Sequence, residues 1–293
     1  MRWLALGTLA VLGFTACGSD TTLGGSSGES GAGAQSGSGG QGGSAGSASA
    51  GSSSGGSSSS TGGSAGQDAG VSAPGWQSAY VDGAQSFSCD ADLETLKAQL
   101  STWLEFDGVT LAVGFEQVGN NQNPLVARFD GDTQTYCVKH ETSGPDGRAW
   151  GLTWDGGSTA YVVYTIVGGG TELENRGGWL SSYAPGAISG GGSKVSYVGK
   201  INAGDGELAR GTFIIAVKSD NKVNSHSPAG PITVLESGDV EFLGSSAHKP
   251  IDVNQKPMDC TDYPFSSRYR FSPDLDQVIC ADCTNCQSAT PCQ

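Results

Sequence analysis

The chain has 293 residues, of which 48 are glycine, 36% are hydrophobic and 15% are charged. A globular chain averages roughly 45–50% apolar and about 25% charged residues, so these values exclude a globular fold along the whole length. The formal net charge of −14 argues against binding to nucleic acid, which requires a basic face that neutralises phosphates.

The amino terminus has the order of a secretory signal. Arg2 precedes the apolar run 3–14, which is shorter than the roughly 20 residues that a membrane-spanning helix needs. Residues 14–17 (FTAC) resemble the bacterial lipobox, although Phe stands where Leu is usual. The resemblance implies that the signal peptide 1–16 is removed and that Cys17 carries the lipid anchor, with palmitate among its acyl chains. The alternative is an ordinary secretory signal that is cut nearby.

Residues 17–74 are predicted to comprise the lipidated cysteine and a disordered tether. Gly and Ser make up most of this stretch, so almost no apolar surface can be buried to offset the entropy cost of ordering it. Gly/Ser statistics give the tether a reach of roughly 40 Å. It is similar in style to the tethers of myxobacterial lipoproteins. Gly18 after Cys17 implies, by the enterobacterial sorting rule, an outer-membrane anchor with the domain on the periplasmic or extracellular face.

Residues 75–258 are predicted to form an all-β domain of antiparallel sheets, because β-branched and aromatic runs alternate with turns rich in Gly, Asp and Asn. The predicted strands are 109–117, 124–129, 150–154, 159–167, 194–201, 207–217, 231–235, 240–244 and 268–271. One short helix is expected near 92–104, because leucines follow Asp90 at helical spacing and an N-cap is available. A strand is the alternative for this segment.

A weak internal repeat extends over 109–244. Its copies begin at Leu125 and Tyr197, with a third beginning at Arg268, and each reads as strand, turn and further strands around an acidic or Gly-containing turn. This pattern resembles the blade unit of bacterial β-propeller repeat proteins. The resemblance implies a β-propeller-like domain. A β-sandwich is the alternative, because only two clear units are visible.

The glycine-rich stretch 168–193 interrupts the strand pattern. So long a loop in a compact domain is usually functional or disordered. It contains Trp179 and Tyr183, two aromatic rings that could stack on a sugar ring or on a partner. The alternative is that Trp179 and Leu180 anchor the loop on the sheet as a hydrophobic peg.

The Cys-rich C-terminal segment 259–293 is expected to be braced by disulfides, since an exported chain meets an oxidising compartment. An odd number of cysteines follows Cys17, which leaves at least one thiol free, metal-bound or intermolecular. The close spacing of the tail cysteines predicts at least one bridge to Cys260 or to the sheet. A zinc site and an iron–sulfur cluster are the alternatives. The cysteines that are candidates for disulfide bonds are Cys89, Cys137, Cys260, Cys280, Cys283, Cys286 and Cys292.

No motif identifies a catalytic residue, and no cofactor or metal is expected. Cys137 and His140 could form half of a metal site, but a solvated histidine is the simpler interpretation. Two carboxylate pairs would fit glycoside chemistry only if their members lie about 5–10 Å apart in space; they are Glu172 with Glu174 and Asp130 with Asp132. Asp residues beside Gly or Asn are expected in turns, with Ca²⁺ binding as the functional alternative; they include Asp155, Asp205, Asp220 and Asp239.

The sequence favours a lipid-anchored binding or interaction module on the cell envelope, with an unknown glycan or protein as its ligand. The rival hypotheses are an extracellular hydrolase that acts on envelope or environmental polymer and a passive coat protein. An enzyme should bring several titratable groups into one concave pocket, whereas a binding module needs no such convergence.

Overall fold

The computed structural model describes residues 72–167, 172–183, 193–288 and 290–293. The predicted signal peptide, Cys17 and nearly all of the predicted tether lie outside these residues. The described part begins at Ser72, which already forms a β-bridge with Leu235. Next to it, the N–H of Ala73 donates to the carbonyl of Val234 at 2.7 Å. Ser72 and Ala73, which precede the predicted domain boundary at 74, therefore already take part in β-pairing.

Antiparallel sheets dominate the described part, as the sequence predicts. The first sheet has the order β2-β3-β4-β5 (Trp103–Phe106, Val109–Val118, Asn121–Asp130, Thr133–Lys139). The second has the order β1-β6-β7-β8-β9 (Gln77–Tyr80, Gly147–Trp154, Thr159–Val167, Lys194–Asn202, Leu208–Ile214). The third has the order β12-β14-β17-β18 (His226–Pro228, Val240–Ser246, Phe265–Phe271, Val278–Cys283), and β13 (Thr233–Val234) also pairs with β14.

Two small sheets and one helix complete the described elements. One small sheet has the order β11-β10-β15 (Val223–Asn224, Ala216–Val217, Lys249–Pro250). The other pairs β16 with β19 (Asp259–Cys260, Cys286–Gln287). Because β17 and β18 belong to the same sheet as β14, the Cys-rich C-terminal segment is part of the β-domain and not an appendage to it.

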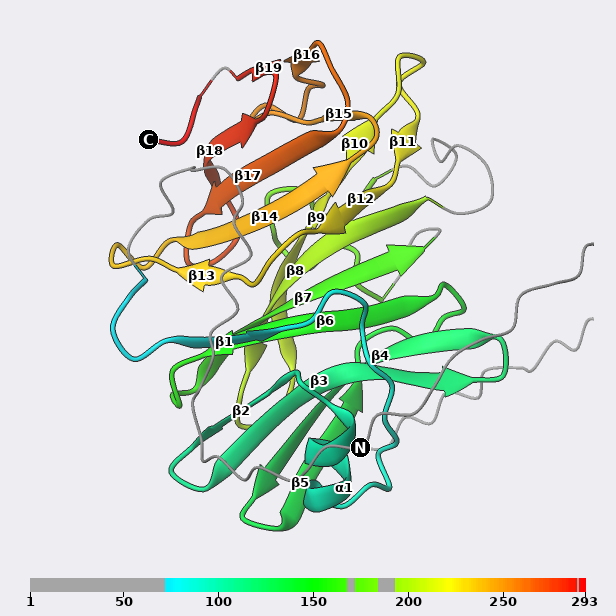
Figure 1. The fold of residues 1–293 in the computed structure, drawn as a ribbon, viewed down its shortest axis with the longest axis vertical. Helices are drawn as coiled ribbons and strands as arrows, with labels where there is room; N and C mark the ends of the chain where they lie inside the picture. The colour runs from blue at the N-terminus through cyan, green and yellow to red at the C-terminus, as the bar shows by residue number, and fades with distance from the viewer. Residues whose placement is uncertain (1–71, 168–171, 184–192, 289) are drawn as a thin grey trace, which may run out of the picture. The chain divides into compact units, whose positions relative to one another are not determined.

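The three large sheets lie one upon another, as Figure 1 shows. One hydrophobic core lies between the first and second sheets, and another lies between the second and third. The middle strand β7 supplies both, since Val162 faces the first core and Val163 the second. Burial on both faces explains why the run at β7 is apolar at nearly every position instead of alternating.

The described sheets form a sandwich-like stack and not a closed ring, so the β-sandwich is the expectation that holds. The predicted repeat does not match this organisation. Strands of its first copy lie in the first sheet (β4) and the second (β6, β7), whereas strands of its second copy lie in the second sheet (β8) and the third (β13, β14). Each copy therefore crosses from one layer to the next, and neither forms a blade of its own.

The predicted helix is present but shorter than expected. Helix α1 (Leu93–Gln99) begins at Asp92, whose carboxylate accepts the N–H of Thr95 at 2.7 Å as an N-cap. The predicted extension to Leu104 is wrong, because Leu104 lies in β2 opposite Leu111 and is buried in the first core. Sheet pairing and burial outweigh the helical spacing of this last leucine.

A third hydrophobic cluster covers the outer face of the first sheet. Leu96 and Leu100 from the helix region, together with Phe87, pack there against Leu125 and Phe129 of β4. The segment that leads into α1 is thereby held on the sheet. This packing places residues 84–88 beside β3, where the candidate site is found.

Candidate functional site

The two aromatic residues predicted as a stacking platform are packed into the domain. Tyr183 is 7% exposed and meets Phe213 edge-on, with the ring centroids 4.9 Å apart. Trp179 is partly buried, and its indole N–H donates to the carbonyl of Val253 at 3.1 Å. Leu180 is buried beside them. The described part of the loop, 172–183, therefore has the arrangement expected of the hydrophobic peg.

His140 is buried, which corrects the expectation of a solvated side chain. Its Nε2 lies 2.8 Å from the carbonyl of Gly206, and its Nδ1 lies 2.7 Å from the hydroxyl of Tyr164. A carbonyl can only accept, so Nε2 carries the proton and Nδ1 accepts from Tyr164. Burial, with a smaller contribution from the positive charge of Arg176, lowers the pKa of His140 to about 4, although the hydrogen bond to Gly206 opposes this shift. Its predicted metal partner Cys137 is tied in a disulfide.

A pocket of about 620 Å³ opens above His140 and gathers three carboxylates, those of Glu172, Asp205 and Glu207. Two of them hold the backbone in place. Both oxygens of Glu172 accept hydrogen bonds from Thr142, at 2.7 and 2.8 Å. Asp205 accepts the N–H of Glu207 at 2.9 Å and so closes its turn. The pocket is charged, but its histidine and two of its carboxylates have structural partners.

Three of the other predicted carboxylates also have local roles. Asp130 of the second candidate pair lies at the end of β4 and accepts from Nε of Arg128 at 2.8 Å. The turn residues Asp155 and Asp220 accept backbone N–H groups two residues further along the chain. These contacts are the turn-closing function that the sequence predicts for Asp beside Gly or Asn.

His226 lies at the centre of a polar cluster in the second core. Its Nε2 is 2.8 Å from the hydroxyl of Ser267, and its Nδ1 is 3.1 Å from the hydroxyl of Ser196. The side chain is fully buried, and this burial lowers its pKa to about 3. Although the residue types suggest a nucleophile and a base, the cluster is enclosed, so it serves as a hydrogen-bonded part of the core.

Six of the seven candidate cysteines form disulfides, and the seventh, Cys283, is a buried free thiol. One unpaired thiol is what the odd number of cysteines predicts. The predicted bridge from the tail to Cys260 is also confirmed. The pairs are Cys89–Cys137, Cys260–Cys286 and Cys280–Cys292.

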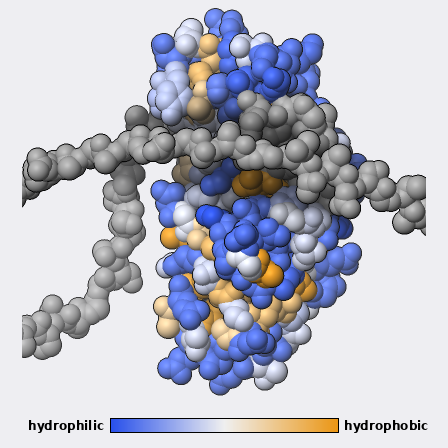
Figure 2. Space-filling view, turned by 90° about the vertical axis from the view of Figure 1, so that its right-hand side faces the viewer, coloured by the Kyte–Doolittle hydropathy of each residue, from blue (hydrophilic) through white to orange (hydrophobic). Residues whose placement is uncertain are grey.

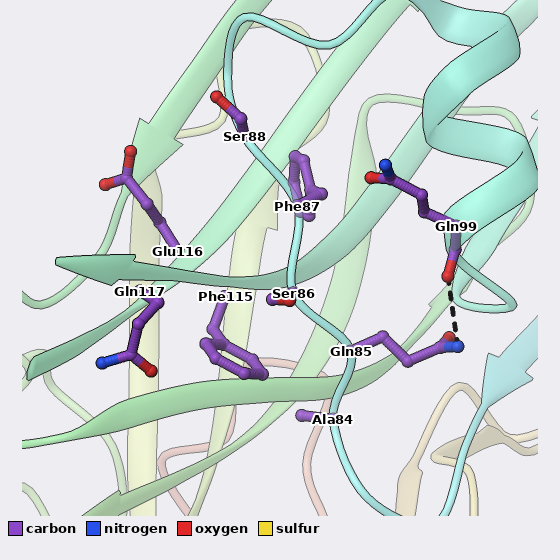
Figure 3. Close-up of a pocket in the computed structure, with 9 residues that line it drawn as sticks. All are labelled: Ala84, Gln85, Ser86, Phe87, Ser88, Gln99, Phe115, Glu116 and Gln117. Atoms are coloured by element: carbon purple, nitrogen blue, oxygen red, sulfur yellow. Dashed lines mark hydrogen bonds between the residues drawn. The ribbon is translucent and has the colours of Figure 1, made fainter.

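A groove of about 830 Å³ lies beside β3 and is missed by the sequence analysis. The groove is lined by the segment Ala84–Ser88, which we call the strap, by Gln99 at the end of α1 and by the last residues of β3. In Figure 3 the strap runs between Gln99 on one side and Glu116 and Gln117 on the other. Polar side chains predominate among its lining residues. They are Gln85, Ser86, Ser88, Gln99, Glu116 and Gln117, with Phe87, Phe115 and Ala84 as the apolar members.

The strap runs along β3 like a short additional strand. The N–H of Phe87 donates to the carbonyl of Phe115, and the N–H of Phe115 donates to the carbonyl of Gln85, both at 3.0 Å. This approach requires glycine at position 114, since a Cβ there would lie 2.5 Å from the carbonyl oxygen of Gln85. Any larger residue would push the strap away from the sheet.

Side-chain contacts fasten both ends of the strap. The amide of Gln85 donates to the carbonyl of Gln99 at 3.3 Å and accepts the N–H of Ser101 at 2.7 Å, which joins the strap to the end of α1 (Figure 3). Just beyond the strap, Cys89 is bonded to Cys137 on β5. The groove is therefore formed before any ligand binds.

Two lining residues of the groove have charged neighbours outside it. The guanidinium carbon of Arg148 lies 5.2 Å from the ring centroid of Phe115. Glu116 pairs with Lys139 at 2.5 Å, and both side chains are partly exposed. The amides and hydroxyls of the lining can donate to and accept from a polar ligand, the carboxylate can accept, and the phenyl ring offers an apolar face.

Few large hydrophobic side chains are strongly exposed on the rest of the described surface. Its exposed large hydrophobic residues are Val118, Tyr263 and Ile279. Figure 2 shows a largely hydrophilic side, with hydrophobic residues gathered toward the end that carries the first sheet. Within the described ranges, no helix has the length and apolar character needed to cross a bilayer.

No family model matches the chain, and no curated protein matches its sequence. The geometry of the two pockets is therefore the basis for a functional interpretation.

Proposed function

We propose that this chain is an envelope-anchored lipoprotein whose β-domain binds a glycan in the groove beside the strap. The supporting observation is the lining of the groove, in which three glutamine amides, two serine hydroxyls and one carboxylate occur together with Phe115. Sugar hydroxyls both donate and accept hydrogen bonds, so amides and hydroxyls suit them. The C–H face of a sugar ring can pack on a phenyl ring. A few convergent polar groups around an apolar surface are typical of a ligand site.

The fixed position of the strap also supports a binding function. Its backbone pairs with β3, Gln85 joins it to the end of α1, and Cys89 joins it to β5. A site that is ordered before binding avoids much of the entropy cost of immobilising loops and side chains around a ligand. The strap therefore favours recognition of an extended polar ligand along β3.

The contacts in the pocket above His140 favour binding over the alternative of a hydrolase. A hydrolase needs a group that can give or take a proton at the reacting atom. His140 uses both ring nitrogens within the fold, and Glu172 uses both carboxylate oxygens to hold Thr142. Proton transfer by these groups would disturb the contacts that hold His140 to Tyr164 and Gly206 and those that hold Thr142 to Glu172.

The binding proposal is tested with the double variant Ser86→Ala/Gln99→Ala, because neither side chain is needed to hold the strap. The full-length chain is applied to a panel of immobilised bacterial and environmental polysaccharides. We expect the wild type to bind at least one of them and the variant to bind it about tenfold more weakly, since each lost hydrogen bond contributes about 0.5–1.5 kcal/mol.

Gln134→Ala is the matched control, because Gln134 is an exposed glutamine on β5 outside the groove. It should bind like the wild type. Equal affinity of the double variant and the wild type, or binding to none of the polysaccharides, would contradict the proposal.

The proposed anchor has its own test, which is metabolic labelling with a radioactive fatty acid in a bacterial host. We expect the label on the wild-type chain and its complete loss in Cys17→Ser, because this cysteine is the proposed acylation site. Cys283→Ser removes a different thiol and should retain the label. Labelling that survives Cys17→Ser would refute the lipidation site.

A further inference from the structure

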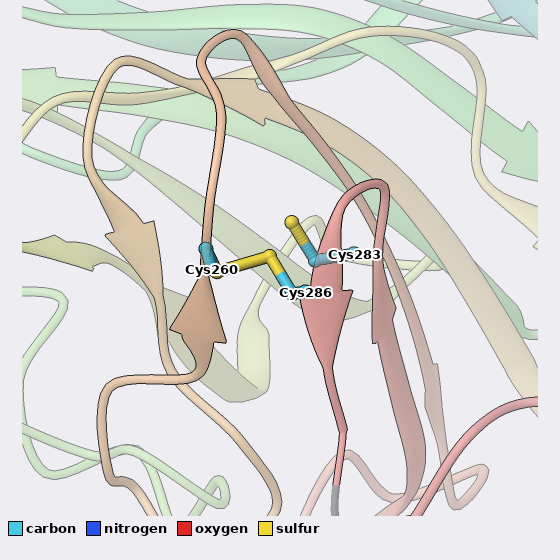
Figure 4. A group of neighbouring side chains, drawn as sticks. All are labelled: Cys260, Cys283 and Cys286. Atoms are coloured by element: carbon cyan, nitrogen blue, oxygen red, sulfur yellow. A yellow bond between two sulfur atoms is a disulfide. The ribbon is translucent and has the colours of Figure 1, made fainter.

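Three cysteine sulfurs meet where β16, β18 and β19 come together. The Sγ atoms of Cys260, Cys283 and Cys286 all lie within 4.8 Å of one another (Figure 4). Cys260 and Cys286 form a disulfide, whereas Cys283 is a free thiol. The other tail disulfide, Cys280–Cys292, does not belong to this cluster. The fold thus places a third sulfur beside a disulfide.

The backbone fixes these three positions by contacts that do not involve sulfur. Cys283 and Cys286 flank the tight turn between β18 and β19, where Asn285 has a φ of 62°. Cys260 lies directly opposite Cys286 in the β16–β19 pair. The carbonyl of Asn285 accepts the N–H of Thr261 at 3.0 Å, which links the turn to β16. Opening the disulfide would therefore leave three thiols held close together.

We propose that the reduced protein binds one thiophilic divalent ion, of the Zn²⁺ or Cd²⁺ class, through Cys260, Cys283 and Cys286. Three thiolates are the soft ligands that such ions prefer. The Cys283–Cys286 spacing, with two residues between, is a common zinc-ligand spacing, and three protein ligands leave a fourth tetrahedral position for water. The proposal is independent of glycan binding, because the cluster and the groove share no residue.

Two chemical steps convert the disulfide form into the metal form. A dithiol reductant transfers two electrons and two protons to the Cys260–Cys286 bond, which becomes two thiols while the reductant becomes a disulfide. The ion then binds the three sulfurs, and three protons are released to solvent. Because these thiol protons must leave when the ion binds, affinity should rise with pH.

The surroundings of the cluster provide a route for the ion. Cys260 and Cys283 are buried, but Cys286 is partly exposed. Cys260 also lines a pocket of about 280 Å³, together with His248 and Tyr263. The pocket gives space for the ion to enter and for a water ligand to remain.

The test uses the full-length chain in a Cys17→Ser background, so that every thiol counted belongs to the folded part. The protein is reduced with dithiothreitol, desalted under nitrogen and titrated with CdCl₂. We expect saturation at one Cd²⁺ per chain, with an ultraviolet sulfur-to-metal charge-transfer band. The oxidised protein should give no band, because two of the three sulfurs are bonded to each other.

Cys283→Ser should lose the band and weaken Cd²⁺ binding at least tenfold. The serine hydroxyl can still donate to the carbonyl of Thr284, as the thiol does in the wild type. The matched control is Cys280→Ser/Cys292→Ser, which removes two other tail thiols and should retain one Cd²⁺. The proposal is overturned if the band survives Cys283→Ser, if the control loses it, or if no ion binds the reduced wild type.

A second measurement does not depend on the folding of any variant. Cd²⁺ should protect the three cluster thiols of the reduced wild type from iodoacetamide, while Cys280 and Cys292 stay reactive; peptide mass mapping distinguishes the two groups. Equal alkylation of the three cluster thiols and of Cys280 and Cys292 in the presence of Cd²⁺ would overturn the assignment.

Discussion

Lowering the pH from 7 to 5 is expected to reduce the free energy of unfolding by about 4 kcal/mol, because two buried histidines stay neutral in the folded protein. Burial lowers the pKa of His140 to about 4 and that of His226 to about 3. In the unfolded chain, a histidine titrates near a pKa of about 6.5. Below about pH 6.5, the two histidines bind protons in the unfolded state but stay neutral in the folded state. The stability is thus fully present above about pH 6.5 and is lost as the pH falls toward the folded pKa values.

Urea denaturation at pH 7, 6 and 5 measures this effect, over a range in which most carboxylates remain ionised. Each buried histidine contributes a slope of about 1.4 kcal/mol per pH unit below its unfolded pKa. His140→Gln should therefore remove about half of the slope, even though it also lowers stability at pH 7. A flat profile in the wild type would show that the two histidines accept protons in the folded state.

Removal of the Cys89–Cys137 disulfide is expected to lower the free energy of unfolding by about 4 kcal/mol. The bond joins residues 48 positions apart, and the loop-entropy relation gives a value near this size for such a loop. The variant is Cys89→Ala/Cys137→Ala, measured by urea denaturation at pH 7. Since the bond fastens the chain just after the strap, the same variant should also weaken glycan binding.

Cys280→Ala/Cys292→Ala provides the control for this second prediction. Its sequence separation is 12, so its expected cost is about 3 kcal/mol, and glycan binding should be retained because the bond is remote from the groove-lining residues. The entropic account fails if the two disulfides rank in the opposite order. The link to the groove fails if Cys89→Ala/Cys137→Ala binds glycan as the wild type does.

Most of the long strands were predictable from the sequence because their β-branched and aromatic runs are continuous and end at turn residues. The run 159–167 corresponds to β7 without change, and the predicted strand 109–117 is one residue shorter than β3. The long strands β5 and β18 were missed. Of the short strands, only β10 and β13 fall within predicted ones. β12 and β16 have two or three residues each, and their formation depends on partners far away in the chain. Local propensity carries little information about such pairings.

The candidate site was not predictable, because its parts meet only through tertiary contacts. Nothing in the local sequence marks the strap as a partner of β3. Ser86 and Phe115 form a parallel β-bridge although they lie far apart in the sequence. The one available signal was Gly114, a glycine within a run otherwise suited to a strand, which is typical of close backbone approach. Likewise, the burial of His140 depends on Tyr164 and Gly206, which are distant in sequence.

The cysteine count predicted one odd thiol but could not identify it. Cys283 is left unpaired because Cys286, across the β18–β19 turn, is in register with Cys260 on β16. Strand register decides the pairing, and register is a property of the folded sheet.

The first residues of the described part determine how mechanical tension enters the domain. A pull on the chain ahead of Ser72 reaches the Ala73–Val234 hydrogen bond first and then β1, which is paired along its length with β6. Only after these have separated does tension arrive at residues 84–88. The groove is therefore shielded from a load applied at the amino-terminal end while β1 remains in its sheet.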